Sequence, residues 1–324
     1  MRSQAFRVSC FLVLTTWLLC FVCSAQQDSG PPAMIANLVD PDAGMVTISK
    51  RVDEVNLLFT ATDSKGRFVT DLEASDVQVF DNRMPPEGIR SFQKESDLPL
   101  RVGLVIDLSE SITDRFKFEK KAAATFLKKS LRPTDQAFIV GFNQKVQLFQ
   151  DFTGNPAVLG QAVQRMKAGG NTSFYDAVVF ACHKLQEQPR DHQTRKVLIL
   201  ITDGQDTSSK GILADAEQAA ARAEASIFAL STNDLKYDDY PKGEAVLELL
   251  TRYAGGQILR ARDADQLTKA FAQVEQALRS QYVLAYKPAD FTPDGSFRTI
   301  ELRPNKPKLR IQCRRGYYAP REAH

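Results

Sequence analysis

Oxygen-bearing side chains recur in three separate segments of this 324-residue chain. Asp107, Ser109 and Ser111 stand two residues apart, and Thr172 and Asp203 follow much later. A hard divalent cation prefers oxygen ligands, and Mg²⁺ keeps several waters while one or two carboxylates hold it. Residues at i, i+2 and i+4 of an extended segment share a side, so the first three can point toward one centre. These five residues are candidate ligands of one divalent cation, with Mg²⁺ preferred and Mn²⁺ or Ca²⁺ as alternatives.

Each candidate carboxylate follows an apolar run that is typical of a buried strand. Residues 102–106 directly precede Asp107, and residues 197–201 end two positions before Asp203. Thr172 falls at a loop-to-helix junction between these two strands. In an open α/β sheet, ligands bind outside the carboxyl ends of the strands. We therefore expect the candidate ligands to meet at one rim of a sheet.

Strand and helix patterns alternate along residues 99–280. Short apolar or β-branched runs predict strands, and a 3.6-residue apolar period between capping and turn signals predicts helices. The predicted strands are 102–106, 137–142, 146–149, 197–201 and 226–230, and the predicted helices are 114–131, 156–166, 173–186, 212–225, 245–253 and 264–278. This alternation predicts an α/β fold with a doubly wound, mostly parallel sheet and helices on both faces.

Strand-like runs without helical periodicity flank this core on both sides. They are residues 45–48, 55–61, 77–80 and 89–92 before it, and 282–286, 297–302 and 309–313 after it. Residues 26–98 carry 13 acids and 7 bases, whereas residues 297–324 carry 8 bases and 2 acids. Because a stable sheet needs three or more strands, we predict that 26–98 and 281–324 pack as one small β-domain with opposite charges across strands. Two independent solvated faces are the alternative.

The first 25 residues have the layout of a secretory signal peptide. Arg2 and Arg7 form a positive start, residues 8–23 carry no charge, and Ala25 is the expected cleavage position. The uncharged run is shorter than the roughly 20 residues that a spanning helix needs, so a retained membrane anchor is the weaker interpretation. We expect no stable membrane span after cleavage and a secreted, periplasmic or cell-envelope location.

Charge and composition exclude several functions. With 42 Lys+Arg and 39 Asp+Glu, the formal net charge of +3 gives no electrostatic footprint for nucleic acid. The three histidines, His183, His192 and His324, are too few and too scattered for a histidine-based zinc site. Cys182 and Cys313 are the cysteines that follow the predicted signal peptide. They could pair in an exported protein, but Cys182 lies in an apolar helical stretch and suits a buried thiol.

The three segments resemble the von Willebrand factor type A domain. Asp107-x-Ser109-x-Ser111, Thr172 before Tyr-Asp-Ala, and Thr-Asp203-Gly after an apolar strand match that family's metal-ion-dependent adhesion site, in order. The resemblance implies a Rossmann-like fold and a divalent cation, most readily Mg²⁺, bound by these five residues. It also implies a protein partner that completes the metal shell with an Asp or Glu carboxylate.

The flanking segments extend the resemblance. Residues 55–92, 281–286 and 315–320 resemble a bacterial secreted subfamily that is related to this domain. This resemblance implies bacterial cell adhesion outside the cytoplasm, without naming a partner.

Simpler roles stay open for several of these residues. The two serines of the first segment could cap the helix that follows, and Asp203 could form a plain turn. Asp114 suits a helix N-cap better than a second cation site. Asp176 and Asp206 stand near the candidate ligands and are suited to hydrogen bonding around them.

Three functions remain as hypotheses. The first is a secreted adhesion module that binds a partner carboxylate through its cation. The second is an envelope component in which the metal only stabilises the fold. The third, a metal-dependent hydrolase, is the weakest, because Ser109 stands where phosphoryl-transfer hydrolases place a second acid after Asp107. No phosphate-binding glycine loop or Gly-x-Ser-x-Gly elbow is present either, so we expect no enzymatic activity.

Overall fold

The computed structural model describes residues 54–94, 98–110, 115–188, 194–233 and 242–321. The predicted signal peptide, the predicted strand at 45–48, Ser111 and Asp114 lie outside the described residues. In the described part of the chain, every helix is too short or too polar to span a lipid bilayer.

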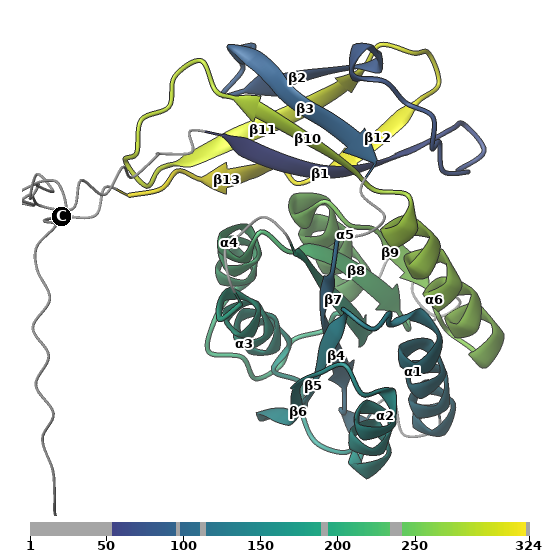
Figure 1. The fold of residues 1–324 in the computed structure, drawn as a ribbon. Helices are drawn as coiled ribbons and strands as arrows, with labels where there is room; N and C mark the ends of the chain where they lie inside the picture. Colours follow the sequence, from purple (N-terminus) through teal and green to yellow (C-terminus); the bar gives the residue numbers. More distant parts are fainter. Residues whose placement is uncertain (1–53, 95–97, 111–114, 189–193, 234–241, 322–324) are drawn as a thin grey trace, which may run out of the picture. The chain divides into compact units, whose positions relative to one another are not determined.

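Six strands form the central sheet, in the order β6-β5-β4-β7-β8-β9 (Figure 1). They are β4 Leu100–Asp107, β5 Gln136–Phe142, β6 Val146–Thr153, β7 Arg195–Thr202, β8 Ser226–Ser231 and β9 Ile258–Arg260. Strand β6 at one edge runs antiparallel to β5, and the other neighbours are parallel. The prediction of a mostly parallel, doubly wound sheet is therefore confirmed.

The described residues form six helices, of which five connect strands of this sheet and α6 leads from β9 to β10. They are α1 Phe116–Ser130, α2 Pro156–Arg165, α3 Phe174–Gln186, α4 Leu213–Ala223, α5 Lys242–Ala254 and α6 Ala264–Arg279. Two of them begin at side chains that satisfy free backbone amides. The Asn155 side chain accepts hydrogen bonds from the first amides of α2, and Asp263 accepts one from Gln266 of α6.

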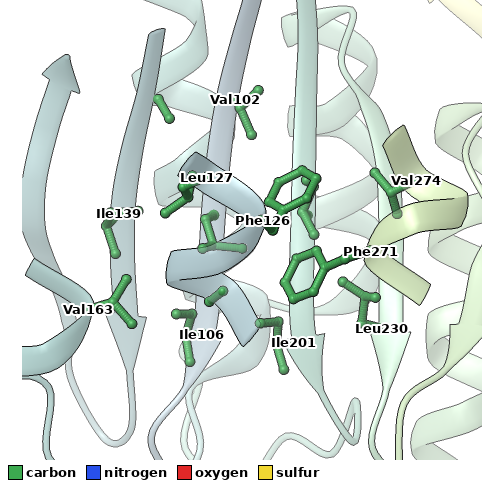
Figure 2. Packing of buried hydrophobic residues seen from close by; sticks show 14 of the residues in the cluster. Val102, Ile106, Phe126, Leu127, Ile139, Val163, Ile201, Leu230, Phe271 and Val274 are labelled. Carbon is green, nitrogen blue, oxygen red and sulfur yellow. The ribbon is translucent and has the colours of Figure 1, made fainter. Parts of the chain in front are cut away.

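Helices α1, α2 and α6 cover one face of the sheet, where they share one buried apolar cluster with its strands. In Figure 2, Phe126 of α1 and Phe271 of α6 lie next to each other over the strands, with stacked rings whose centroids are 4.5 Å apart. Ile106, Ile201 and Leu230 supply the sheet side of this cluster. Burying each such side chain is worth about 1.5–3 kcal/mol, so this layer holds the central strands in place.

Helices α3, α4 and α5 cover the opposite face (Figure 1). Helix α4 presents small side chains such as Ala216 and Ala220 to this second core. Cys182 of α3 is fully buried in the same cluster, as the apolar stretch around it predicted. Cys182 and Cys313 are both free cysteines, so the structure contains no bond between them.

The remaining strands form two antiparallel sheets, in the orders β12-β1-β10-β3 and β13-β11-β2. They are β1 Val55–Thr62, β2 Val77–Asp81, β3 Gly88–Lys94, β10 Tyr282–Lys287, β11 Phe297–Pro304, β12 Arg310–Cys313 and β13 Gly316–Tyr318, with a short 3₁₀ helix at Ala74–Asp76. Each sheet combines strands from before and after the α/β core. The chain therefore leaves the β-sheets after β3 and returns to them at β10.

Opposite charges from the two ends of the chain meet in these sheets. Lys287 lies 2.7 Å from Glu87, and Lys306 lies 2.8 Å from Asp76. Both pairs are partly exposed, and such pairs contribute about 0–1 kcal/mol each. The shared apolar core of these strands is therefore the larger source of stability, while the exact domain boundaries stay predictions.

Candidate functional site

Asp107 is the last residue of β4, and its side chain is fully buried. Its Oδ1 accepts a hydrogen bond from the Ser109 amide at 2.8 Å, and its Oδ2 accepts one from the Thr202 hydroxyl at 2.8 Å. The Thr202 hydroxyl in turn accepts a hydrogen bond from the amide of Gly204 at 3.0 Å. The ends of β4 and β7 are thus tied together through the Asp107 carboxylate.

The environment of Asp107 disfavours its negative charge. Burial raises the pKa of Asp107 to about 6, and the negative charge of nearby Asp203 contributes to this rise. The Ser109 amide and the Thr202 hydroxyl oppose the rise because they donate hydrogen bonds to the carboxylate. A cation between Asp107 and Asp203 would favour the ionised form of both carboxylates.

Thr172 lies in a loop that is joined to the other two candidate segments. Its amide donates to the Thr207 hydroxyl at 3.0 Å, and its carbonyl accepts from the amides of Thr207 and Ser208 at 2.9 and 3.0 Å. On the other side, the Glu110 amide donates to the Gly170 carbonyl at 3.1 Å. The loops that follow β4 and β7 therefore both contact the loop that carries Thr172.

Asp203 follows β7 and is half-buried. Its Oδ1 accepts a hydrogen bond from the Gln205 amide at 3.0 Å, and its carbonyl accepts one from the Asn233 side chain at 2.8 Å. Asn233 also donates to Glu244 of α5 at 3.0 Å. A Cβ at Gly243 would lie 2.1 Å from the Asp203 carbonyl oxygen, so only glycine allows this approach. The start of α5 thus fixes the backbone at Asp203.

The structure brings four of the five predicted ligands to the same rim. Asp107, Ser109, Thr172 and Asp203 lie at the carboxyl ends of β4 and β7 or in the loop bonded to them, and Ser111 lies outside the described residues. Within the described ranges, no three His, Cys, Asp or Glu side chains form a group that could hold a metal ion. A cation here would therefore depend on two carboxylates together with hydroxyl groups and water.

Comparison with known families identifies this part of the chain. Residues 102–205 match the family model described as von Willebrand factor type A domain. The chain contains a von Willebrand factor type A domain. The matched range runs from β4 to the loop after β7 and includes all five predicted ligands. No curated protein matches the chain in sequence.

Several solved structures resemble the chain at low sequence identity. The PilB minor pilin from Streptococcus sanguinis is 13% identical with a TM-score of 0.47, over 61% of this chain and 63% of the pilin. BatB from Bacteroides thetaiotaomicron, described as a conserved hypothetical protein, is 16% identical with a TM-score of 0.46, over 55% of this chain and 98% of BatB. A von Willebrand factor type A protein from Catenulispora acidiphila is 14% identical with a TM-score of 0.46, over 83% and 74% of the two chains. This chain thus spans less than two thirds of the pilin.

Two further aspartates shape the rim of the type A domain by binding backbone amides. Asp206 accepts a hydrogen bond from the Phe174 amide at the start of α3, at 2.8 Å. Asp176 of α3 accepts hydrogen bonds from the amides of Lys210 and Gly211, both at 3.0 Å. A carboxylate at a helix N-terminus is favoured by the helix dipole. These two residues hold the loop after Asp203 against α3, which is a more specific role than the sequence indicated.

Sequence reasoning missed one acidic residue of the type A domain, Glu119 of α1. It is 1% exposed, and neither carboxylate oxygen has a hydrogen-bond partner. Arg115 lies 3.4 Å from it and donates to the Thr232 carbonyl at 2.9 Å. Burial raises the pKa of Glu119 to about 7; Arg115 opposes this rise, while Asp107 and Asp203 increase it. The available signal was helical spacing, because Glu119 lies on the apolar side of α1.

Acidic side chains gather at the rim of the type A domain and behind it. Asp107 and Asp203 raise the pKa of Glu119, and Arg115 opposes this rise. Buried negative charges without compensation are costly, so a cation near these acids would be stabilising. Asp107 and Asp203 are the carboxylates at the rim that would bind the ion, with Ser109 and Thr172 as neutral oxygen donors. Glu119 would act through charge alone.

Proposed function

We propose that this chain is a secreted or cell-envelope protein that binds a partner protein through a divalent cation. The cation, Mg²⁺ in the first place and Mn²⁺ or Ca²⁺ otherwise, would lie at Asp107, Ser109, Ser111, Thr172 and Asp203. The partner would supply an Asp or Glu carboxylate. The family match supports a protein-interaction module, and the observation that carries the metal hypothesis is the pair of carboxylates, Asp107 and Asp203, at the ends of β4 and β7.

The ligand set would leave the cation electrophilic. Asp107 and Asp203 supply two negative charges, and the remaining protein ligands are neutral hydroxyls. Mg²⁺ retains water in such sites, so at least one coordination position exchanges readily. An incoming carboxylate that replaces a water gains direct Coulomb attraction, reduced by the cost of its own desolvation. A partner acid is therefore a better sixth ligand than a neutral side chain.

The loop after Asp203 would supply the rest of the contact with the partner. Its hydrogen bonds to Asp176 and to the backbone of Thr172 give it a defined shape, and Ile212 at its end is 63% exposed. Apolar anchors surrounded by polar groups are typical of energetically important interface positions. We propose Ile212 as a contact residue and the loop as the determinant of specificity.

The metal hypothesis is tested by calorimetry with Mg²⁺ on the chain and on two variants. Asp107→Asn removes a charged ligand while it keeps the shape of the side chain, and we expect Mg²⁺ binding to be lost. Asp290→Asn removes an exposed aspartate in the connection between β10 and β11, and we expect unchanged binding. Equal Mg²⁺ affinity in Asp107→Asn and the unmodified chain would refute the site.

The partner hypothesis needs a second experiment. The chain is used to capture proteins from the envelope fraction of its host, once with millimolar Mg²⁺ and once with excess chelator. Capture that requires Mg²⁺ supports adhesion through the cation. If chelator lowers the unfolding temperature but leaves the partner bound, the metal is structural and the envelope-component hypothesis is correct.

A further inference from the structure

A second polar site lies at the end of the α/β sheet opposite the candidate metal centre. A cavity of about 220 Å³ opens between the amino ends of β7 and β8, the last turn of α4, and the outer side of the β12-β1-β10-β3 sheet. Its lining includes the charged side chains Arg195, Lys196, Arg222, Glu224 and Arg314. The cavity and the proposed metal site therefore lie at opposite ends of the strands of the α/β sheet.

The charge of this lining is strongly positive. Four of the five charged side chains are basic, which gives +4 − 1 = +3. The one acid, Glu224, lies 2.9 Å from Nη1 of Arg314. The carboxyl end of α4 is also close and carries a partial negative charge, which Arg222 in its last turn offsets. The balance of charge favours an anion in this cavity.

Two hydrogen-bond donors of the lining are buried without an acceptor. The hydroxyl of Thr194 and the Nε of Arg314 are both inaccessible to solvent and make no hydrogen bond. Most buried polar groups in folded proteins are hydrogen-bonded, so a pair of such donors in one cavity is unusual. An acceptor in the cavity reaches these donors only when the side chains that cover them move aside.

Arg222 is the accessible cation of this lining. Its guanidinium packs over the ring of Tyr318, with Cζ 4.3 Å from the ring centroid. A planar cation held on an aromatic face keeps its N–H groups free for a flat or tetrahedral oxyanion. A second hollow of about 500 Å³ shares Arg222 and Arg314 with the cavity and continues from it. An anion therefore has a route of entry from the solvent.

We propose that this cavity binds a compact oxyanion of the phosphate type, either free phosphate or the phosphate group of a small ester. The volume is below the roughly 300–1,000 Å³ that is usual for organic ligands, so a small, highly charged group fits best. Tetrahedral oxyanions accept several hydrogen bonds at once, so Arg222 can bind one first and the covered donors of Thr194 and Arg314 can add to it once they open to the cavity. A bound phosphate would also bridge α4 and the β-sheet that contains β1.

The test is isothermal titration of inorganic phosphate into the full chain, with chelator present and chloride as the balancing anion. Chelator removes divalent cations, so the result for phosphate does not depend on whether the chain binds a metal ion. We expect one phosphate per chain. We expect Arg222→Gln and Thr194→Val each to weaken binding at least about tenfold, the scale of one lost charge-assisted hydrogen bond. Arg165→Gln, an exposed arginine of α2 outside the lining, should bind as the unmodified chain does.

Thermal unfolding of each variant without phosphate serves as the control for folding. Arg222 is exposed and Thr194→Val keeps the shape of its side chain, so both variants should unfold near the temperature of the unmodified chain. Absence of phosphate binding to the unmodified chain, or equal binding in both variants, would overturn the proposal. Acetate that binds as tightly as phosphate would also overturn it. Tighter binding of glycerol 3-phosphate than of phosphate identifies an ester as the ligand, and the reverse identifies the free ion.

Discussion

Glu119→Gln should stabilise the metal-free protein at high pH and have little effect at low pH. Glutamine has the size of glutamate and the charge of its protonated form. The substitution therefore removes the negative charge of a side chain that is only 1% exposed and that accepts no hydrogen bond. This charge is also repelled by those of Asp107 and Asp203. The only charge that it leaves uncompensated is that of Arg115, whose guanidinium still donates to the Thr232 carbonyl.

The size of the effect follows from the pKa of Glu119. Folding raises this pKa from 4.5 to about 7. Below pH 4.5 the carboxyl is protonated in the folded and unfolded states, and its ionisation costs no stability. Between pH 4.5 and 7 the carboxyl is ionised in the unfolded state but still protonated in the folded state. The free energy of unfolding therefore falls as the pH rises over this range. A pKa that is higher by about 2.5 corresponds to a free energy of unfolding that is ~3 kcal/mol lower at pH 8 than it would be without the shift, and nearly unaffected below pH 4.5.

Urea unfolding at pH 5 and pH 8, with chelator present, measures this difference. We expect Glu119→Gln to raise the free energy of unfolding by up to ~3 kcal/mol at pH 8 and by less than about 1 kcal/mol at pH 5. Glu275→Gln on α6, at a partly exposed position, is the matched control for the loss of an acid. If Glu119→Gln destabilises the protein equally at both pH values, the reasoning about its buried charge is wrong.

Three further outcomes are expected from other parts of the chain. Thr172→Ala should weaken Mg²⁺-dependent partner binding with little change in unfolding temperature, because it removes a loop hydroxyl and one methyl group outside the apolar cores; equal binding in a pull-down would exclude Thr172 as a ligand. Deletion of residues 281–324 removes β10 to β13, exposes the edges of β1 and β2 and should cause aggregation, which light scattering detects; a soluble product with protected β1 amides in hydrogen exchange would contradict this. Cleavage after Ala25 removes Trp17, the only tryptophan, so exported protein should lack indole emission, and its presence would show that the leader is retained.

The sequence was most informative where one periodicity continued over several residues. The apolar runs at β4 and β7 and the helical spacing of α1 and α6 predicted those elements close to their observed bounds. Strands β9 and β13, of three residues each, were missed because so short a segment has no measurable period. Helix α5 begins at Lys242, before the predicted 245. Gly243 lies in the first turn of α5, where its backbone packs closely against the carbonyl of Asp203.

The candidate site was predictable where backbone topology alone places residues together. Parallel neighbours β4 and β7 end at the same rim, so Asp107 and Asp203 were expected to meet. Glu119 could not be found in this way, because its position depends on how α1 packs over the sheet. Arg222 and Arg314 are 92 positions apart, and no local pattern connects them. Charge clusters that form between distant elements require the tertiary structure.

The connection between the α/β core and the β-sheets has a mechanical consequence. The chain enters the core after Lys94 and leaves it at Tyr282, and these two residues are direct partners in the antiparallel pair β3 and β10. Tension applied by a partner at the far rim would travel through the core and reach the sheet at two adjacent strands. Strands β3 and β10 would be pulled in the same direction and from the same end. The hydrogen bonds between these two strands would therefore not be sheared. The resisting bonds are then those from β10 to β1, next to the cavity that Arg314 lines.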